Sequence, residues 1–215
     1  MIPATPIEPP RDCPLCPRLV EFRETQRAAH PDWHNAPVPS FGDPQAWLAI
    51  VGLAPGLQGA NRTGRPFTGD FAGVLLYETL IRFGLAEGTF EARPDDGLEL
   101  TGAVIINAVR CVPPQNKPTP AEIKTCRQFL TPNLEALPNL RVVVALGAIG
   151  HQSAVKAMGG RLPKARFGHL AEHVMPSGLT LIDSYHCSRY NQNTRVLTAE
   201  MFEAVFARAL VFRPD

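Results

Sequence analysis

The sequence predicts an α/β fold in three layers, with helices on both faces of a central, mainly parallel sheet of four strands. Short apolar runs alternate along the chain with segments of helical periodicity, and strands that are buried on both faces of a parallel sheet have this character. Polar or glycine-rich loops directly follow three of these runs, at residues 52–70, 107–116 and 183–193. In a parallel sheet, the carboxyl ends of the strands and their loops meet at one edge, so we expect a ligand site there.

The predicted strands are the apolar runs at residues 47–51, 103–106, 142–146 and 179–182. Helical spacing of apolar residues predicts helices at residues 16–29, 72–83, 148–158 and 198–211, and one that begins near Thr119. At that last helix, Thr119 is suited to the N-cap, Pro120 to the first turn and Glu122 to the third position. We expect one domain over residues 1–215, because a hydrophobic fraction of 45% fills one core and leaves little for a second.

Composition narrows the function classes. No stretch approaches the roughly 18 uncharged apolar residues that a membrane span needs, and residues 1–10 lack the pattern of a secretory signal. We therefore expect a protein of the cytoplasm, which is a reducing compartment. A net charge of +1, from 21 basic and 20 acidic residues, argues mildly against long tracking of phosphates but allows a basic rim around a pocket.

Five cysteines direct attention to metal binding. Their odd number in a reducing compartment argues against a disulfide framework. Cys13 and Cys16 form a CxxC pair, while Cys111 and Cys126 are separated by fourteen residues. Four thiolates fit either structural zinc or a [4Fe–4S] cluster, and the wide second spacing favours the cluster because zinc sites usually repeat a CxxC-like pair. We expect Cys187 to be a small half-buried residue outside this site.

The loop at residues 52–70 follows the first predicted strand and is rich in glycine. It matches neither the GxGxxG pattern nor the P-loop, which requires a lysine, so a nucleotide cofactor has little support. Phe67 and Asp70 stand among its small residues, and an aromatic face with a carboxylate can hold a planar heterocycle and position a water. The alternative is an irregular loop that uses glycine only for its turns.

The loop at residues 183–193 follows the last predicted strand and concentrates hydrogen-bonding side chains, with Arg189 and Arg195 as cations. Catalytic groups commonly lie on loops that a rigid scaffold positions, so we expect a functional role for His186. We expect structural roles for the other histidines, which are His30, His34, His151, His169 and His173.

Three motifs in order, together with the four paired cysteines, resemble the uracil-DNA glycosylase superfamily. More narrowly, the chain is similar to its prokaryotic iron–sulfur branch, family 5 or type B, over residues 13–193. The motifs are Gly52-Leu53-Ala54-Pro55-Gly56 continued by Asn61–Asp70, Ile105–Pro114, and His186-Cys187-Ser188-Arg189-Tyr190-Asn191.

The resemblance implies a DNA-repair enzyme that flips a damaged base out of DNA and hydrolyses its N-glycosidic bond. It implies that Phe67 stacks on the base, that Asn107 bonds the base edge or orients the water, and that His186 stabilises charge on the pyrimidine oxygen. The remaining base-binding residues would be Gly52, Leu53 and Ala54. The DNA-binding residues would be Arg65, Ser188, Arg189 and Asn191. The resemblance further implies a [4Fe–4S] cluster on Cys13, Cys16, Cys111 and Cys126.

Position 53 distinguishes the branches. Family 4 has a glutamate after the first glycine of the first motif, and other uracil glycosylases have an aspartate near it, whereas this chain has Leu53. Leucine cannot activate a water, so we nominate Asp70, whose alternative role is to cap the helix that follows it. The missing acid is associated in the family with wider tolerance, which extends to hydroxymethyluracil, ethenocytosine and deaminated purines.

The expected partner is therefore DNA that contains uracil or other damaged bases, bound by a monomer without contact to a membrane. The competing class is a metal- or redox-sensing α/β protein without glycosylase activity. A further enzymatic alternative is hydrolysis of nucleosides or phosphate esters in the same pocket.

Overall fold

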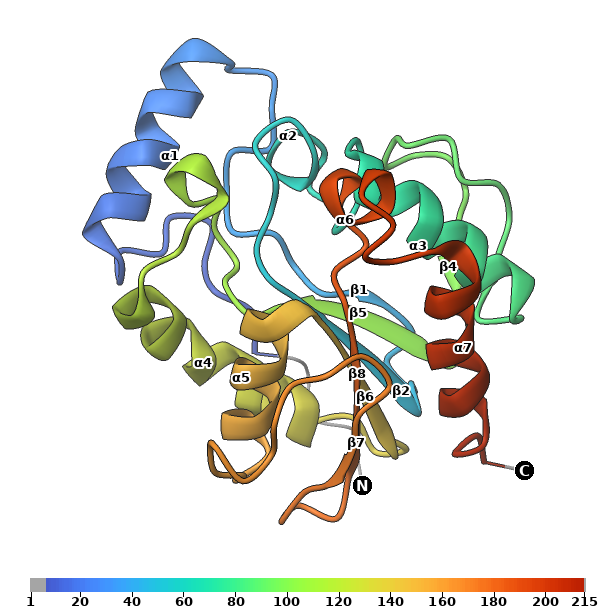
Figure 1. The fold of residues 1–215 in the computed structure, drawn as a ribbon. Helices are drawn as coiled ribbons and strands as arrows, with labels where there is room; N and C mark the ends of the chain where they lie inside the picture. Colours follow the sequence, from blue (N-terminus) through green and yellow to red (C-terminus); the bar gives the residue numbers. More distant parts are fainter. Residues whose placement is uncertain (1–6, 215) are drawn as a thin grey trace.

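The computed structural model describes residues 7–214, so residues 1–6 and 215 of the expected domain lie outside it. Its centre is a six-stranded sheet in the order β1-β5-β2-β6-β8-β7, and the four inner strands run parallel (Figure 1). The inner strands are β2 (Leu48–Gly52), β5 (Ala103–Asn107), β6 (Val142–Leu146) and β8 (Thr180–Ser184). These are the four predicted strands, and the α/β prediction is confirmed.

The prediction of four strands was too low. Two antiparallel strands extend the sheet at its edges: β1 (Phe41–Gly42) pairs with β5, and β7 (Glu172–Val174) pairs with β8. Both edge strands are short and none of their residues is buried, so they lack the apolar run by which the inner strands were recognised. A separate two-stranded sheet joins β3 (Ala86–Glu87) to β4 (Glu99–Leu100).

The register aligns the carboxyl ends of the inner strands. Gly52, the last residue of β2, lies opposite Asn107, the last residue of β5. Leu146, the last residue of β6, lies opposite Ser184, the last residue of β8. The loops that follow these residues therefore leave the sheet at the same edge, where we expected the ligand site.

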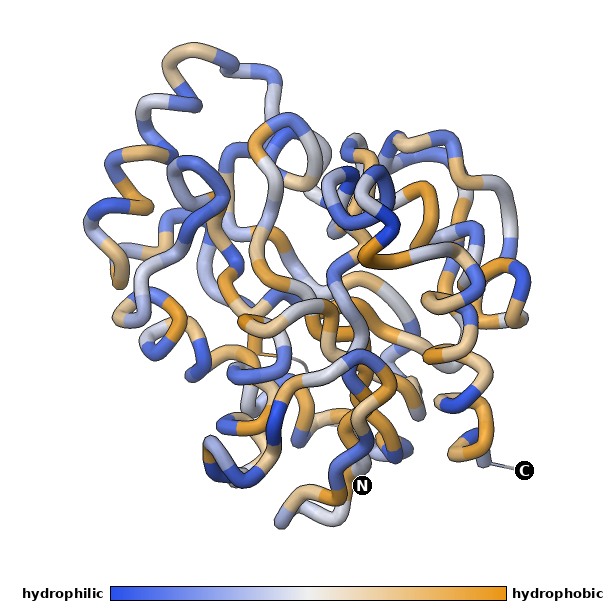
Figure 2. Tube along the Cα trace, viewed as in Figure 1, coloured by the Kyte–Doolittle hydropathy of each residue, from blue (hydrophilic) through white to orange (hydrophobic). Residues whose placement is uncertain are grey.

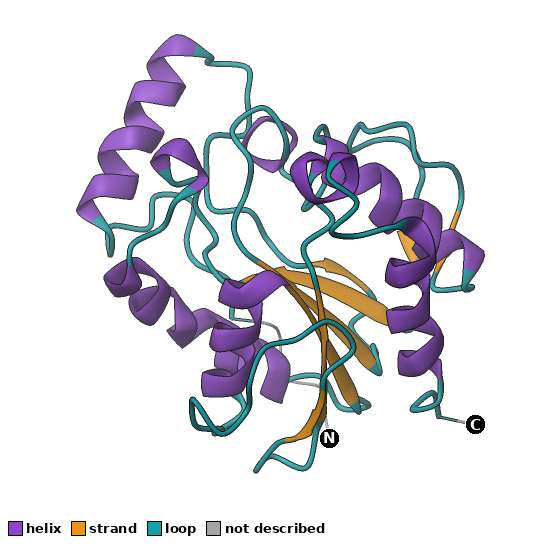
Figure 3. Cartoon of the chain, viewed as in Figure 1, coloured by secondary structure: helices purple, strands orange, loops and turns teal. Residues whose placement is uncertain are grey.

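Helices cover both faces of the sheet, and Figure 3 shows the strands between two groups of helices. Helices α4 and α5 lie over one face, and α3 and α7 lie over the other. The helices are α1 (Pro17–Ala29), α2 (Ala60–Thr63), α3 (Phe71–Arg82), α4 (Pro120–Glu135), α5 (Gly147–Ala157), α6 (Arg189–Asn193) and α7 (Ala199–Leu210). Two of them, α2 and α6, are short and lie in segments that we expected to be loops.

Hydrophobic side chains fill both spaces between sheet and helices. All residues of the four inner strands are buried, and hydrophobic residues run through the centre of the molecule (Figure 2). Along β2, Ile50 packs into the core under α3 and α7, while Ala49 and Val51 pack into the core under α4 and α5. Alternate residues of each strand thus serve the two cores.

Local chemistry fixes where the helices begin. Thr119 caps α4, and its hydroxyl accepts the N–H of Glu122, whose carboxylate accepts the N–H of Thr119 in return. Asp70 and Thr198 cap α3 and α7 in the same way, by accepting a backbone N–H three residues on. Within residues 7–214, none of the helices has the length and hydropathy that crossing a bilayer would require.

Candidate functional site

A pocket opens at the carboxyl edge of the sheet. It encloses about 790 Å³, part of it open to solvent. Its walls come from the three strand-end loops that follow β2, β5 and β8. The predicted site residues that line it are Leu53, Ala54, Phe67, Asp70, Asn107, His186 and Ser188. The structure therefore brings together side chains that are up to 135 positions apart in the sequence, from Leu53 to Ser188.

Phe67 lies on the inner wall of this pocket. Its ring is stacked on that of His186, with 6.0 Å between centroids and 28° between planes. Only 7% of the residue is exposed, and Phe67 belongs both to the core under α3 and α7 and to the lining of the pocket. A β-carbon at Gly52 would come 2.9 Å from the ring, which explains the glycine there. Gly52 itself does not line the pocket but supports Phe67 from beneath, which departs from our expectation that it binds the base directly.

Asn107 closes the bottom of the pocket at the end of β5. It is 2% exposed, and its Oδ1 has no hydrogen-bond partner within residues 7–214. A buried amide oxygen without a partner lowers stability by about 1–3 kcal/mol, so its retention points to a role in binding. Gly52 again provides the room, since a β-carbon there would lie 2.6 Å from Oδ1.

Asp70 fills both of the roles that we considered. Its Oδ1 accepts the N–H of Gly73 at 3.3 Å and so caps α3, while the side chain also lines the pocket. The other oxygen, Oδ2, faces the glycines of the preceding loop, Gly56 and Gly59. Burial raises the pKa of this carboxyl, and the N–H groups of Gly73 and Ala72 partly oppose the rise.

His186 borders the pocket from the loop after β8. Burial lowers its pKa, so the imidazole is neutral at pH 7. Its backbone is held in place because Asn191 Nδ2 donates to the His186 carbonyl at 2.8 Å. On the other side, Gly147 at the start of α5 leaves space for His186, whose Cβ would be 3.2 Å from a β-carbon at that position.

Arg65 corrects our expectation for the DNA-binding residues. It is 5% exposed, and its guanidinium makes two parallel hydrogen bonds of 2.7 Å to the carboxylate of Asp96. The same group lies 5.2 Å from the ring centroid of Phe41 and 5.5 Å from that of Tyr77. A cation that is buried and paired in this way cannot reach a phosphate, so Arg65 stabilises the fold instead.

The other three expected DNA-binding residues lie at the start of α6. Ser188 lines the pocket and caps the helix, with its hydroxyl accepting the N–H of Asn191 at 3.3 Å. Arg189 is exposed, and its guanidinium lies 4.8 Å from the centroid of the Phe71 ring. The side chain of Asn191 is occupied by its bond to His186, so it supports the loop from within.

The four paired cysteines also meet. Cys13, Cys16, Cys111 and Cys126 line one hollow, formed by the start of α1, the loop after β5 and α4. Burial and the mutual repulsion of the thiolates raise the pKa of Cys111 to about 12 and that of Cys126 to about 11. Thiols in such surroundings ionise readily only when a metal compensates their charge, which the donor set fits.

The cysteine hollow receives one backbone hydrogen bond, and the fifth cysteine lies outside it. The backbone N–H of Arg110 donates to Cys126 Sγ at 3.3 Å, a contact of the kind that supports a metal-bound thiolate. Cys187 lies outside the hollow, as we expected, but it is fully buried in the core under α3 and α7 and not half-buried.

Sequence reasoning missed some residues of the pocket. Asn116 lines it from the loop after β5 with a positive φ of 56°, and Ala60 and Ala72 line it from the starts of α2 and α3. Tyr190 does not line the pocket, but it follows Arg189 on α6 and is 73% exposed. A small alanine carries no chemical signal, whereas Asn116 ended a loop that we had singled out and could have been nominated there.

Comparison with known proteins agrees with this geometry. The family model of the uracil DNA glycosylase superfamily matches residues 39–210. The chain is 46% identical over 203 residues to the type-5 uracil-DNA glycosylase of Thermus thermophilus, covering 92% of both chains. It is 40% identical over 202 residues to the type-5 enzyme of Pyrobaculum aerophilum, covering 92% of this chain and 88% of that one.

A third relative extends the range of organisms. The type-5 uracil-DNA glycosylase of Mycobacterium tuberculosis is 40% identical over 205 residues, which are 92% of this chain and 76% of the relative. Similarity of this extent, with the pocket and motifs in the same chain, shows that the protein belongs to the uracil-DNA glycosylase superfamily and, within it, to the type-5 group.

Proposed function

We propose that the protein is a DNA-repair glycosylase that hydrolyses the N-glycosidic bond of uracil and other damaged bases flipped out of DNA. The observation that carries the proposal is the pocket in which Phe67, Asp70, Asn107 and His186 converge at the carboxyl edge of the sheet. It combines an aromatic ring, a carboxylate, a buried free amide oxygen and a neutral imidazole in one hollow open to solvent.

The base would be held by its face and its edge. Phe67 offers a ring against which a flipped pyrimidine can stack, and base–aromatic stacking contributes about 1–3 kcal/mol. Asn107 offers an amide at the pocket floor. Its Oδ1 accepts no hydrogen bond from residues 7–214, so an N–H of the base could donate to it. Removing a base from the stack costs a few kcal/mol and is easiest for mispaired bases such as uracil opposite guanine.

Charge separates as the glycosidic bond breaks. The base gains negative charge, and the neutral imidazole of His186 can donate a hydrogen bond to its oxygen without a change of protonation. The sugar gains positive charge, which the carboxylate of Asp70 and the DNA phosphates would stabilise. Both groups are fixed before the substrate arrives, since their backbones are held by α3 and by Asn191.

The attacking water needs a base, and Leu53 offers none. Asp70 is the carboxylate among the lining residues, and with Oδ1 bonded to Gly73 its Oδ2 remains to orient a water and accept its proton. The raised pKa of Asp70 makes it a better proton acceptor than an exposed aspartate. We therefore propose Asp70 as the general base and Asn107 as the residue that helps to orient the water.

We also propose a [4Fe–4S] cluster on Cys13, Cys16, Cys111 and Cys126. When bound, the cluster would supply cross-linking rather than chemistry, joining the start of α1 to the loop after β5 and to α4. The wide spacing of Cys111 and Cys126 and the convergence of all four thiols support it.

Metal analysis tests the cluster. Anaerobically purified protein should be brown and contain iron and sulfide, and Cys126→Ser should lose both. Cys187→Ala is the matched control, because Cys187 lies in the core, and it should keep the iron. Zinc in place of iron would overturn the cluster and leave the glycosylase proposal standing.

The enzymatic proposal is tested with an oligonucleotide that contains a single uracil. Alkali-labile sites should form at the uracil in both G·U and A·U duplexes, and we expect hydroxymethyluracil, ethenocytosine and hypoxanthine to follow. Hydrolysis of free nucleosides or phosphate esters without action on this oligonucleotide would favour the alternative hydrolase. No hydrolysis at all would favour a metal- or redox-sensing protein.

Because both sites are complete within one chain and the substrate is DNA, we further propose a monomer that acts in the cytoplasm.

A further inference from the structure

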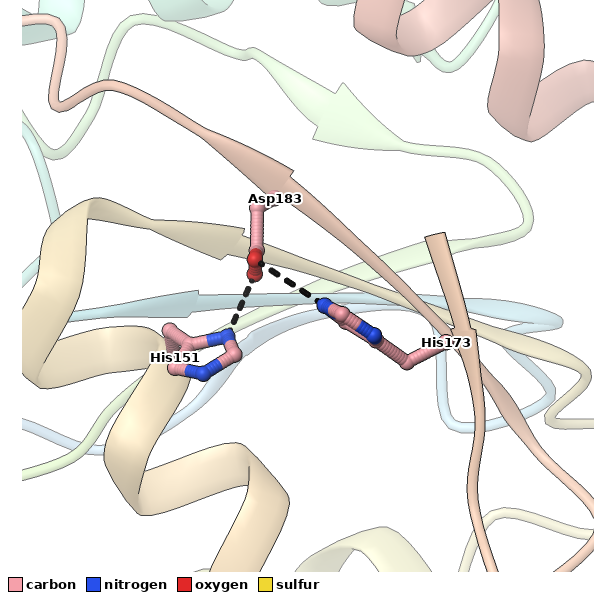
Figure 4. A group of neighbouring side chains, drawn as sticks. All are labelled: His151, His173 and Asp183. Atoms are coloured by element: carbon pink, nitrogen blue, oxygen red, sulfur yellow. Dashed lines mark hydrogen bonds and ion pairs between the residues drawn. The ribbon is translucent and has the colours of Figure 1, made fainter. Parts of the chain in front are cut away.

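A second cluster of metal-binding side chains is centred on β8, the strand that leads into the loop of His186. His151 of α5, His173 of β7 and Asp183 of β8 each offer one ligand atom, and these atoms all lie within 4.8 Å of one another (Figure 4). None of the three lines the pocket or the hollow of the cysteines. They come from three different elements, so their convergence is a feature of the fold and not of one local turn.

Asp183 is the centre of the cluster. Its side chain is inaccessible to solvent, and burial raises the pKa of its carboxyl. A buried carboxylate is stable only when a positive charge lies nearby. Within residues 7–214, its ion-pair partners are the two histidines, at 2.7 Å for His151 Nδ1 and 3.6 Å for His173 Nε2. The carboxylate also accepts the N–H of Gly168 at 3.4 Å, and a cation between the two rings would supply the compensating charge.

The ring of His151 is oriented as a metal ligand would be. Its Nε2 lies 3.1 Å from the carbonyl oxygen of Ala165, to which it donates, and this bond turns Nδ1 toward Asp183. Metal-bound histidines commonly donate their second ring N–H to a carbonyl in this way. The 2.7 Å hydrogen bond between Nδ1 and Asp183 Oδ1 brings these two candidate ligand atoms together.

We propose that His151, His173 and Asp183 bind a divalent zinc ion, with a water as the fourth ligand. Two imidazoles and one carboxylate form a donor set that zinc prefers, and its bonds of about 2.0–2.2 Å place neighbouring donors of a tetrahedron about 3.3 Å apart. The observed separations are 2.7 Å from His151 Nδ1 to Asp183 Oδ1 and 3.6 Å from His173 Nε2 to Asp183 Oδ2, and the three ligand atoms lie within 4.8 Å of one another. Side-chain shifts of about 0.5–1.5 Å bring them to the tetrahedral spacing.

A zinc ion can reach the site from solvent and replace a hydrogen bond that His173 makes without it. The side chain of His173 is 19% exposed, which gives an ion a route from solvent to the buried carboxylate. His173 Nε2 now donates to the carbonyl of Arg166 at 3.1 Å, and it exchanges that bond for the metal. In the zinc-bound state neither His151 Nδ1 nor His173 Nε2 carries a proton. The bound ion ties α5 and β7 to the strand that leads into the His186 loop.

Zinc stoichiometry tests the site in the anaerobically purified protein, with its cysteine site as isolated. After equilibrium dialysis against micromolar zinc chloride, the wild type should hold one more zinc per chain than His173→Asn, with equal iron in both. His30→Asn is the matched control, since His30 is exposed and stacks on Trp33 in another part of the chain. It should bind zinc as the wild type does. Zinc should also raise the melting temperature of the wild type but not that of His173→Asn.

X-ray absorption at the zinc edge provides a measurement that needs no variant. Zinc at the proposed site should show only nitrogen and oxygen neighbours at about 2.0–2.2 Å, including imidazole, whereas zinc on the cysteines would show sulfur at about 2.3 Å. Equal zinc in wild type and His173→Asn, a sulfur shell, or no zinc retained by the wild type would each overturn the proposal.

Discussion

The carboxylate of Asp70 lies directly against Gly59, where a β-carbon would come only 2.6 Å from Oδ2. The other oxygen of Asp70 accepts the N–H of Gly73 at the start of α3. One contact ties the carboxylate to the helix, and the other requires a residue without a side chain in the loop after β2. The position of the proposed general base therefore depends on a glycine that does not itself line the pocket.

We predict that Gly59→Ala displaces this carboxylate and slows excision. The added methyl group overlaps Oδ2, so Asp70 must rotate or the loop must shift, and misplacement of a catalytic group by about 1 Å can cost on the order of 100-fold in rate. We expect at least a tenfold loss in single-turnover rate. Gly168→Ala is the control, because a β-carbon there meets its nearest atom at 3.7 Å. An unchanged rate in Gly59→Ala would show that Asp70 need not hold this position.

Asp70→Asn should slow uracil excision at least tenfold while leaving DNA affinity and melting temperature nearly unchanged. Asparagine caps helices as well as aspartate does, and the variant removes a buried charge, so the fold loses little. A variant that retains the full rate would leave Asp70 as a cap of α3 and transfer the catalytic role to Asn107 and His186.

The same group should set the acid limb of the pH–rate profile. Burial raises the pKa of Asp70, so its carboxylate gains a proton, and the rate falls, at a higher pH than for an exposed aspartate. Burial lowers the pKa of His186, so it adds no limb near pH 7. Asp70→Asn should abolish the acid limb. A limb that persists in the variant would assign it to another group.

Phe67→Leu should weaken binding of a uracil-containing duplex by about 1–3 kcal/mol, the contribution of one base–aromatic stack. Leucine keeps much of the buried volume, which matters because Phe67 is 7% exposed and an alanine would leave a cavity. Affinity for a duplex with an abasic site offers the control, since it has no base to stack and should not change. Equal losses on both duplexes would mean that Phe67 acts through the fold alone.

Arg189 should contribute one phosphate contact. Its guanidinium is exposed beside the pocket, so Arg189→Gln should lower the slope of log affinity against log salt by about one unit. Arg82→Gln is the control, because Arg82 is exposed at the far end of α3. A salt slope that is the same in Arg189→Gln and the wild type would remove Arg189 from the interface.

The inner sheet could be predicted because each of its strands is buried on both faces. The continuous apolar runs of β2 and β6 indicate buried strands and exclude loops. The predicted bounds of all four strands lie within a few residues of the observed ones. The edge strands β1 and β7 could not be predicted, because their few residues are held by pairing with β5 and β8 and not by burial.

The site was predictable to the extent that its residues carry functional groups. Phe67, Asp70, Asn107 and His186 stood out as aromatic or polar residues just after strands, and the parallel register brings them to one pocket. Arg65 shows the limit. The resemblance implied that Arg65 contacts DNA, but its partner Asp96 is 31 positions away and no residue near Arg65 in the sequence indicates the pair.

The most direct test of the account is release of free uracil in a single turnover from a duplex with one G·U pair, measured for the wild type and for His186→Ala by mass spectrometry. The wild type should release one uracil per duplex and leave the sugar–phosphate chain intact. His186→Ala should lose at least a hundredfold in rate, since one prearranged donor to a developing anion contributes about 10²–10³. Absence of free uracil with the wild type, or full activity in His186→Ala, would contradict the assignment of this pocket as the site of glycosidic cleavage.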